Sequence, residues 1–284
     1  MPEAEPPQAC LESLCAQTSR GLLRTRRRRN TRAVVAALVG LLVCGAPGIG
    51  PARAAHPEAQ RRCAASAALE QLSPAPLHTE ARLAQGAPVV VVAIGSSSTE
   101  GIGASSPASS YPARLQARLR RHCLTCVITV INKGVGGETV DQTLARFDRD
   151  VLVYRPNLVI WQVGSNDILR GEDLEAYIAA VTGGIGRLRA AGIEVVLMDM
   201  QFAPSLLVHP QVTAMESRLV EVAQTQRVAL FHRFDIMEQW IVGGRFRFAD
   251  MLSRDALHMT DASYDCLARL LSGALLHEAR DRTP

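Results

Sequence analysis

Short, continuously apolar runs alternate with longer segments of helical periodicity along most of this chain. Five runs rich in β-branched residues lie at 89–94, 127–131, 158–163, 194–198 and 228–231. A strand that is apolar on both faces needs cover on both faces, so these runs predict a parallel sheet between two helical layers. The alternation therefore restricts the chain to an α/β architecture with a buried sheet.

The segments between the runs have the spacing of amphipathic helices. Within 174–191, apolar residues recur every three or four positions, and Gly192 follows as a stop signal. Further helices are predicted at 111–121, 140–148, 212–226 and 262–279. Strand and helix alternate without an internal repeat, which predicts one three-layer, doubly wound domain over residues 88–284. Such domains bind ligands at the carboxyl ends of their strands.

The first 54 residues have the organisation of an export signal. A basic stretch at 24–32 precedes eleven apolar or small residues at 33–43, and the small-residue sequence Ala-Arg-Ala follows at 52–54. An uncleaved membrane anchor is the alternative, but spanning takes about 20 predominantly apolar residues, and glycine and proline interrupt this stretch early. We therefore expect a periplasmic or secreted protein. Residues 55–87 are predicted to be a linker with one short helix near 63–72.

The leader also explains the net charge of the chain. The whole sequence carries +4, of which residues 1–54 contribute +5 and the remainder −1. The domain is therefore nearly neutral, and no nucleic-acid partner is expected. Contact with a membrane is expected only if the leader remains as an anchor.

Four cysteines lie outside the leader: Cys63, Cys123, Cys126 and Cys266. An even number in an exported chain permits disulfides. Cys123 and Cys126 have the spacing of a redox motif, but they fall between a helix and a strand, whereas that motif opens a helix after a strand. A local structural disulfide or two free thiols is therefore the interpretation. No histidine stands at the spacing of a zinc ligand.

Small and hydroxyl residues follow the first predicted strand. Residues 95–101 read GSSSTEG, and neither a GxxxxGK[ST] nor a GxGxxG phosphate loop is present. A serine nucleophile fits better, provided that a base and its orienting acid exist elsewhere. Asp255 and His258 stand immediately before the last predicted helix, and an aspartate three residues before a histidine can accept a hydrogen bond from Nδ1.

Two further strand ends carry donors that suit an oxyanion hole. Residues 132–139 follow the second strand and include Gly137, and residues 164–167 follow the third strand and include Asn166. A glycine N–H and an asparagine amide are donors of the required kind. Asp167 is more typical of a structural hydrogen-bonding residue, and Glu100 of a cap or a solvent-facing side chain.

These four blocks, in this order, resemble those of the SGNH hydrolase superfamily, also called the GDSL esterase/lipase family. The first block, G-D-S-x-T-x-G, matches residues 95–101, and the last, D-x-x-H, matches 255–258. The resemblance implies a three-layer, flavodoxin-like fold with a five-stranded parallel sheet. It also implies site residues in three roles: Ser97 as nucleophile, His258 and Asp255 as base and orienting acid, and Ser97, Gly137 and Asn166 as oxyanion donors.

The chain departs from the family pattern at two positions. Ser96 stands where the family has the aspartate of G-D-S, and Gly136 stands where serine is usual before the second-block glycine. Neither is a triad or oxyanion position in that pattern. The departures therefore concern local hydrogen bonding and substrate fit more than catalysis.

The resemblance and the leader together predict an exported serine esterase without a metal or organic cofactor. Its expected substrate is a small acyl ester, with an O-acetyl group on a carbohydrate as the first choice. A lysophospholipase or arylesterase of broad acyl specificity is the alternative, and a non-catalytic envelope binding module is a rival from another class. We expect the segment 233–254, with Trp240, to form a substrate wall, whereas Trp161 belongs to the core.

Overall fold

The computed structural model describes residues 61–124 and 126–281. The predicted export signal at 1–54 and the first part of the predicted linker, 55–60, lie outside the described residues. Among the residues that are described, no helix combines the length and the apolar character that crossing a membrane requires.

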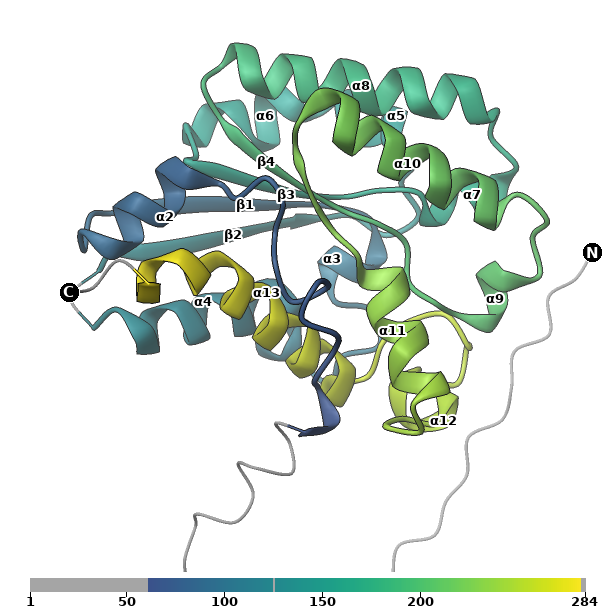
Figure 1. Cartoon of the computed structure of the whole chain (residues 1–284). Helices are drawn as coiled ribbons and strands as arrows, with labels where there is room; N and C mark the ends of the chain where they lie inside the picture. The colour runs from purple at the N-terminus through teal and green to yellow at the C-terminus, as the bar shows by residue number, and fades with distance from the viewer. Residues whose placement is uncertain (1–60, 125, 282–284) are drawn as a thin grey trace, which may run out of the picture. The chain divides into compact units, whose positions relative to one another are not determined.

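A five-stranded, all-parallel sheet forms the middle layer of the domain (Figure 1). Its strands are β1 (Val89–Gly95), β2 (Ile128–Gly134), β3 (Leu158–Gln162), β4 (Glu194–Met198) and β5 (Ala229–Phe231). They lie in the order β2-β1-β3-β4-β5, so the chain forms β1 first, adds β2 at one edge, and then adds β3, β4 and β5 on the other side of β1. The predicted fold class is confirmed. Each strand overlaps one of the five apolar runs. Nearly every residue of β1, β3 and β4 is buried, whereas β2 extends beyond its run to Gly134 and is mostly half-buried.

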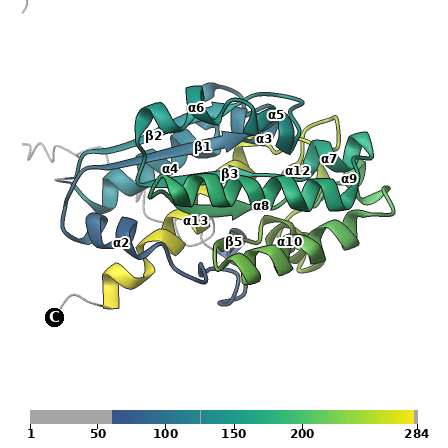
Figure 2. The same ribbon diagram turned by 90° about the horizontal axis from the view of Figure 1, so that it is seen from above.

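Helices cover both faces of this sheet (Figures 1 and 2). One layer contains α2 (Leu77–Ala84), α4 (Tyr111–His122) and α13 (Asp261–Asp281), and the other contains α5 (Val140–Leu144), α6 (Phe147–Asp150), α8 (Leu174–Ala190) and α10 (Val212–Gln226). Shorter elements follow the strand ends: α3 (Ser97–Glu100), α7 (Ser165–Arg170), α9 (Pro204–Leu207), α11 (Arg233–Val242) and α12 (Phe248–Met251). The 3-10 turns η1 (Pro107–Ser109) and η2 (Leu152–Tyr154) complete the described elements.

The single helix predicted at 140–148 is two helices in the structure. Helix α5 ends at Leu144 and α6 begins at Phe147, with the buried Arg146 between them at φ −112°. The guanidinium of Arg146 donates to the carbonyl oxygen of Gly95, at the end of β1. Its contacts lie outside the helix that the apolar periodicity predicted, and periodicity alone carries no signal for them.

Trp161 lies in the core as predicted. Its side chain is fully buried, and its ring meets that of Phe147 edge-on at 5.0 Å between centroids. Helix α8 passes over this ring at Gly184, where a Cβ atom would come within 2.3 Å of the indole. A residue larger than glycine would therefore push α8 off the sheet.

The structure corrects the predicted linker for residues 61–87. Cys63, Leu72 and Leu83 are buried in the same core as the sheet. The sequence predicted a short helix near 63–72. In the structure these residues form turns, and helix α2 lies further along the chain, at 77–84. Glu194 of β4 accepts hydrogen bonds from the backbone N–H groups of His78 and Thr79, which caps the first turn of α2. Partners far away in the sequence thus order a segment whose own periodicity is weak.

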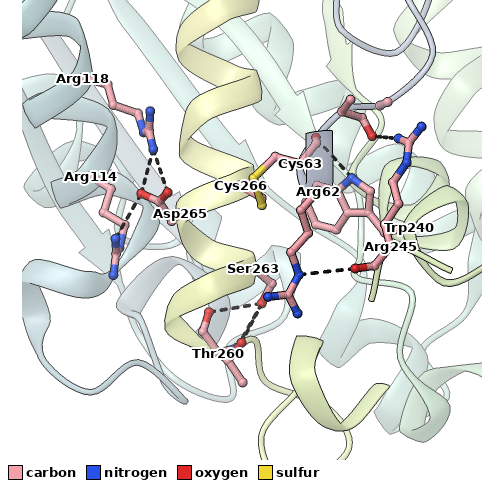
Figure 3. Close-up of a disulfide and its surroundings, with 12 residues drawn as sticks. Arg62, Cys63, Arg114, Arg118, Trp240, Arg245, Thr260, Ser263, Asp265 and Cys266 are labelled. Carbon is pink, nitrogen blue, oxygen red and sulfur yellow. Dashed lines mark hydrogen bonds and ion pairs between the residues drawn. A yellow bond between two sulfur atoms is a disulfide. The ribbon is translucent and has the colours of Figure 1, made fainter. Parts of the chain in front are cut away.

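Two disulfides are present, Cys63–Cys266 and Cys123–Cys126. For Cys123 and Cys126, the sequence left a local disulfide or two free thiols as alternatives, and the structure has the disulfide. The first joins the segment before α2 to the middle of α13 and closes a loop with a sequence separation of 203 (Figure 3). It holds the N-terminal part of the described chain onto the C-terminal helix.

Loop length predicts unequal stabilisation by the two disulfides. In the chain-entropy model, a link that closes a long loop restricts the unfolded chain more than a link across three residues. We expect Cys63→Ala/Cys266→Ala to lower the free energy of unfolding by about 2 to 5 kcal/mol, and Cys123→Ala/Cys126→Ala by about 2 kcal/mol or less. Denaturant unfolding of the oxidised proteins measures both values. Equal losses for the two variants would contradict this prediction.

Candidate active site

The nucleophile predicted from the sequence lies on a tight turn at the carboxyl end of β1. Strand β1 ends at Gly95, and Ser97 is the first residue of the four-residue helix α3. Strand β2 passes directly beside this turn, since a Cβ atom on Gly134 would lie 1.9 Å from the backbone nitrogen of Glu100. Only glycine permits this approach. The adjacent strand end therefore helps to set the position of Ser97.

Ser97, His258 and Asp255 form one chain of hydrogen bonds. The distance from Nε2 of His258 to Oγ of Ser97 is 2.8 Å, and that from Nδ1 to Oδ2 of Asp255 is 2.6 Å. The other carboxylate oxygen accepts hydrogen bonds from the backbone N–H groups of Leu257 and His258 and from the hydroxyl of Ser253. Ser97 thus meets the pair Asp255 and His258, although His258 lies 161 positions further along the chain.

Asp255 is held in its charged form. Partial burial acts to raise the pKa of the Asp255 carboxyl, but the hydrogen bonds from the side chain and backbone of His258, from Ser253 and from Leu257 outweigh it and hold that pKa well below its usual range. An ionised Asp255 favours the tautomer of His258 that carries its proton on Nδ1. Nε2 is then free to accept the hydroxyl proton of Ser97.

The loop that carries His258 is closed upon itself before α13. Leu252 and Met259 form an isolated antiparallel bridge, and the N–H of Ser253 donates to the carbonyl oxygen of His258 at 2.7 Å. The loop after α3 lies against the same place, because a Cβ atom on Gly103 would come within 2.4 Å of the carbonyl oxygen of Met259. The backbone on both sides of the imidazole is therefore restrained.

The two predicted oxyanion residues lie in segments that contact each other, and the segment of Gly137 approaches Ser97. Gly137 has a φ of +80°, which favours glycine, and the neighbouring Gly136 would place a Cβ atom 3.8 Å from that of Ser97. Asn166 belongs to α7, and its side-chain amide donates to the carbonyl oxygen of Glu138 at 2.9 Å. The loop after β2 and the start of α7 are thus joined next to Ser97.

Asp167 and Glu100 have structural contacts. Asp167 is buried and accepts a hydrogen bond from the N–H of Val140 at 3.0 Å, so it anchors the first turn of α5. Burial raises the pKa of the Asp167 carboxyl. Glu100 is exposed, and it accepts a hydrogen bond from the N–H of Gly136 at 2.7 Å. The sequence carried no signal for this contact between Glu100 and the loop after β2 that includes Gly136 and Gly137.

Ser96, which replaces the aspartate of the family pattern, has a defined partner. Its side chain is buried, and both its N–H and its hydroxyl donate to Oε1 of Gln162 at 2.9 Å. Gln162 is the last residue of β3 and was not identified from the sequence, although a polar residue inside the run LVIWQV was its signal. A neutral pair of side chains therefore supports the backbone before the nucleophile.

Arg146 is a second site residue that the sequence did not reveal. Its buried guanidinium donates to the carbonyl oxygen of Gly95, to Glu138 at 2.6 Å and to Asp150 at 3.0 Å. Hydrogen bonds from Arg149 and Arg146 outweigh desolvation and lower the pKa of Asp150 to about 2. One cation thus links the end of the nucleophile strand to the loop that carries Gly137.

Trp240 does not form the predicted substrate wall. Its side chain is fully buried, and its indole N–H donates to the carbonyl oxygen of Cys63 at 3.3 Å (Figure 3). The covering segment is the one that the sequence assigned to a linker, which is why the prediction was wrong. Three other aromatic rings near this segment, those of Phe202, Phe234 and Phe248, are half-buried. The ring centroid of Phe202 lies 5.2 Å from that of Phe234 and 5.9 Å from that of Phe248.

The arrangement provides the elements of nucleophilic catalysis at a carbonyl group. It contains a hydroxyl, an imidazole within hydrogen-bond distance of it, an ionised carboxylate bonded to the imidazole, and a glycine loop that approaches the serine. Within residues 61–124 and 126–281, no group of three or more histidine, cysteine, aspartate or glutamate side chains could hold a metal ion.

Comparison with known proteins places these features in a family context. The model of the non-GDSL lipase-like family matches residues 62–281. An arylesterase of Vibrio mimicus is 30% identical over 96 residues, which are 34% of this chain and 47% of that protein. An acetylxylan esterase of Geobacillus stearothermophilus is 43% identical over 47 residues, which are 16% of this chain and 22% of that protein. The chain thus spans less than half the length of either curated relative.

Solved structures share the fold. A two-domain esterase active on acetylated mannans superposes with a TM-score of 0.61 at 20% identity, over 75% of this chain and 55% of that one. A lipolytic protein of the G-D-S-L family from Desulfitobacterium hafniense superposes with a TM-score of 0.55 at 22% identity, over 66% of this chain and 99% of that one. At these identities the likeness concerns the fold alone.

Proposed function

The chain belongs to the non-GDSL lipase-like family, and we propose that it is a carboxylic ester hydrolase of the SGNH type. The observation that carries the proposal is the hydrogen-bond chain from Asp255 through His258 to Ser97. A serine hydroxyl is a weak nucleophile unless a base accepts its proton. In these hydrogen bonds, His258 is the base and Asp255 is the acid that orients it. The family and the esterase relatives support the same activity.

The proposed reaction has two halves that use the same residues. Nε2 of His258 takes the proton of Ser97 as Oγ attacks the ester carbonyl, and it then returns that proton to the leaving alcohol. An acyl-enzyme on Ser97 remains. A water molecule repeats the cycle, with His258 as base, and releases the acid and the free hydroxyl of Ser97. Asp255 stabilises the imidazolium in both halves.

The negative charge that develops on the carbonyl oxygen needs donors already in place. We assign this role to the N–H groups of Ser97 and Gly137 and to the side chain of Asn166. The amide of Asn166 carries two N–H groups, and one of them donates to Glu138. The other is available to the oxyanion. The hydrogen bond to Glu138 thus orients the amide and leaves its second N–H group for the oxyanion.

For the substrate, we propose a small acyl ester, with an O-acetyl group on a carbohydrate as the first choice. Two of the similar proteins are an acetylxylan esterase and an esterase active on acetylated mannans, which supports this choice. An arylesterase activity is the second candidate. The similarity to the arylesterase of Vibrio mimicus favours it.

Removal of the hydroxyl of Ser97 tests the esterase proposal. We expect Ser97→Ala to reduce the rate of p-nitrophenyl acetate hydrolysis by at least about 1000-fold, because the nucleophile is lost. Ser106→Ala is the matched control, since this serine lies exposed on the loop before η1. Equal rates for wild type and Ser97→Ala would exclude the mechanism and favour a binding module.

Acyl length and alcohol separate the two substrate candidates. For a deacetylase of carbohydrates, we expect kcat/KM on p-nitrophenyl esters to fall as the acyl chain lengthens, and acetylated xylan or mannan to release acetate. The Ser97→Ala protein provides the background. Activity on p-nitrophenyl esters of short and long acyl chains alike, without acetate release from either polymer, would contradict this choice and favour the arylesterase.

We also propose that the protein is exported to the periplasm or secreted. The order of basic, apolar and small residues in 1–54 supports export, and so do the two disulfides, since such bonds persist in oxidising compartments. N-terminal sequencing of the protein from its native host should begin near Ala55. An intact leader would point to the membrane anchor instead.

A further inference from the structure

Ser97, Asn166 and His258 each have a sequence neighbour in one hydrogen-bond network around two buried glutamines. Ser97 is flanked by Ser96 and Ser98, Asn166 follows Ser165, and His258 follows Leu257. Two buried glutamines, Gln162 and Gln201, connect these flanking residues. Ser96, Ser98, Ser165, Leu257 and the two glutamines lie at the carboxyl edge of the sheet, and none of these six residues has a role in the proposed reaction except through its neighbour.

Gln201 is the centre of this network. It lies in the segment after β4 with 1% of its surface exposed. Its Oε1 accepts hydrogen bonds from the hydroxyls of Ser165 at 2.8 Å and Ser98 at 3.3 Å. Its Nε2 donates to the carbonyl oxygen of Leu257 at 3.3 Å. One side chain therefore contacts the nucleophile turn, the start of α7 and the residue before His258.

Gln162 extends the network to the other side of the nucleophile. Its Nε2 donates to Oγ of Ser165 at 3.3 Å, and its Oε1 accepts the two hydrogen bonds from Ser96. Ser165 therefore links the two glutamines, because its hydroxyl accepts from Gln162 and donates to Gln201. The backbone on both sides of Ser97 is thus connected to the loop of His258.

The donors and acceptors of the network permit only one orientation of Gln201. The carbonyl oxygen of Leu257 can only accept, so the amide nitrogen must face it. The hydroxyls of Ser98 and Ser165 then donate to the amide oxygen. A side chain that presents an acceptor at both ends cannot replace this glutamine without leaving a buried carbonyl opposite another acceptor.

We propose that Gln201 is a positioning residue that holds the imidazole of His258 at hydrogen-bond distance from Ser97. Its amide donates to the carbonyl oxygen of Leu257, the residue next to His258. Its amide oxygen is bonded to Ser98 and Ser165, so it fixes the position of the His258 loop relative to these two residues. A misplacement of about 1 Å in a catalytic group costs on the order of 100-fold in rate. The kinetic effect rests on the proposed esterase function, whereas the contact itself does not.

Gln201→Glu tests the role, because this change preserves the shape of the side chain and replaces the amide donor by a carboxyl oxygen that donates only when it is protonated. An ionised carboxylate turns an acceptor toward the carbonyl of Leu257 and repels it, whereas a protonated carboxyl group donates to it. Burial raises the pKa of a carboxyl group. We expect kcat/KM to fall about 10- to 100-fold at alkaline pH, with the loss in kcat, and the ratio of variant to wild type to rise as the pH falls.

Gln116→Glu is the matched control for the same chemical change. Oε1 of Gln116 accepts a hydrogen bond from the N–H of Val130 at 2.8 Å, on α4 and away from the network. A carboxylate keeps that acceptor, so we expect a ratio to wild type near one at every pH. Ratios that do not vary with pH for Gln201→Glu, or a change confined to KM, would overturn the proposal.

Hydrogen exchange of residues 252–260 tests the contact without any ester substrate. We expect exchange in this segment to be faster in Gln201→Glu than in wild type at alkaline pH, and unchanged in Gln116→Glu. Ser165→Ala, which breaks the link between the two glutamines, is a second variant and should also lower kcat. A wild type that hydrolyses no ester would refute the proposed function alone, and unchanged exchange in Gln201→Glu would refute the role of Gln201.

Discussion

The burial of a parallel sheet on both faces is the constraint on which the rest of this structure depends. Strands that are apolar on both sides leave no place for polar chemistry except at their ends. Because β1, β3 and β4 are buried along nearly their whole length, the polar residues gather where the chain leaves the sheet. In a parallel sheet all the carboxyl ends lie on one edge, so loops distant in sequence meet there.

Two different kinds of polar contact hold that edge together. The guanidinium of Arg146, a buried cation between two carboxylates, joins the end of β1 to the loop of Gly137. On the other side, Gln162 and Gln201 form a network of neutral amide and hydroxyl groups. The only charge in the hydrogen-bond chain of Ser97 is then the carboxylate of Asp255. Its own hydrogen bonds keep it ionised.

The N-terminal segment shows why weak periodicity is a poor guide to order. Residues 61–87 contain few regularly spaced apolar residues, yet Cys63 and Leu83 are buried. Their order comes from distant partners, namely Cys266 of α13, Trp240 of α11 and Glu194 of β4. The burial of Trp240 beneath this segment is also what removes it from the substrate surface. The contact between Trp240 and Cys63 thus bears on both predictions, because it helps to order residues 61–87 and lies where the indole is buried.

The sequence by itself determined the alternation of strands and helices, and hence the layers and the edge that carries the site. It also identified Ser97, Asp255 and His258 as candidate site residues, because their blocks are local and stand after the first predicted strand and before the last predicted helix. The tertiary structure alone decided how that edge is held. The contacts of Arg146, Gln162 and Gln201 join residues that are distant in sequence, and no local periodicity encodes such partners. Apolar patterns report burial, whereas polar partners depend on where folded loops meet.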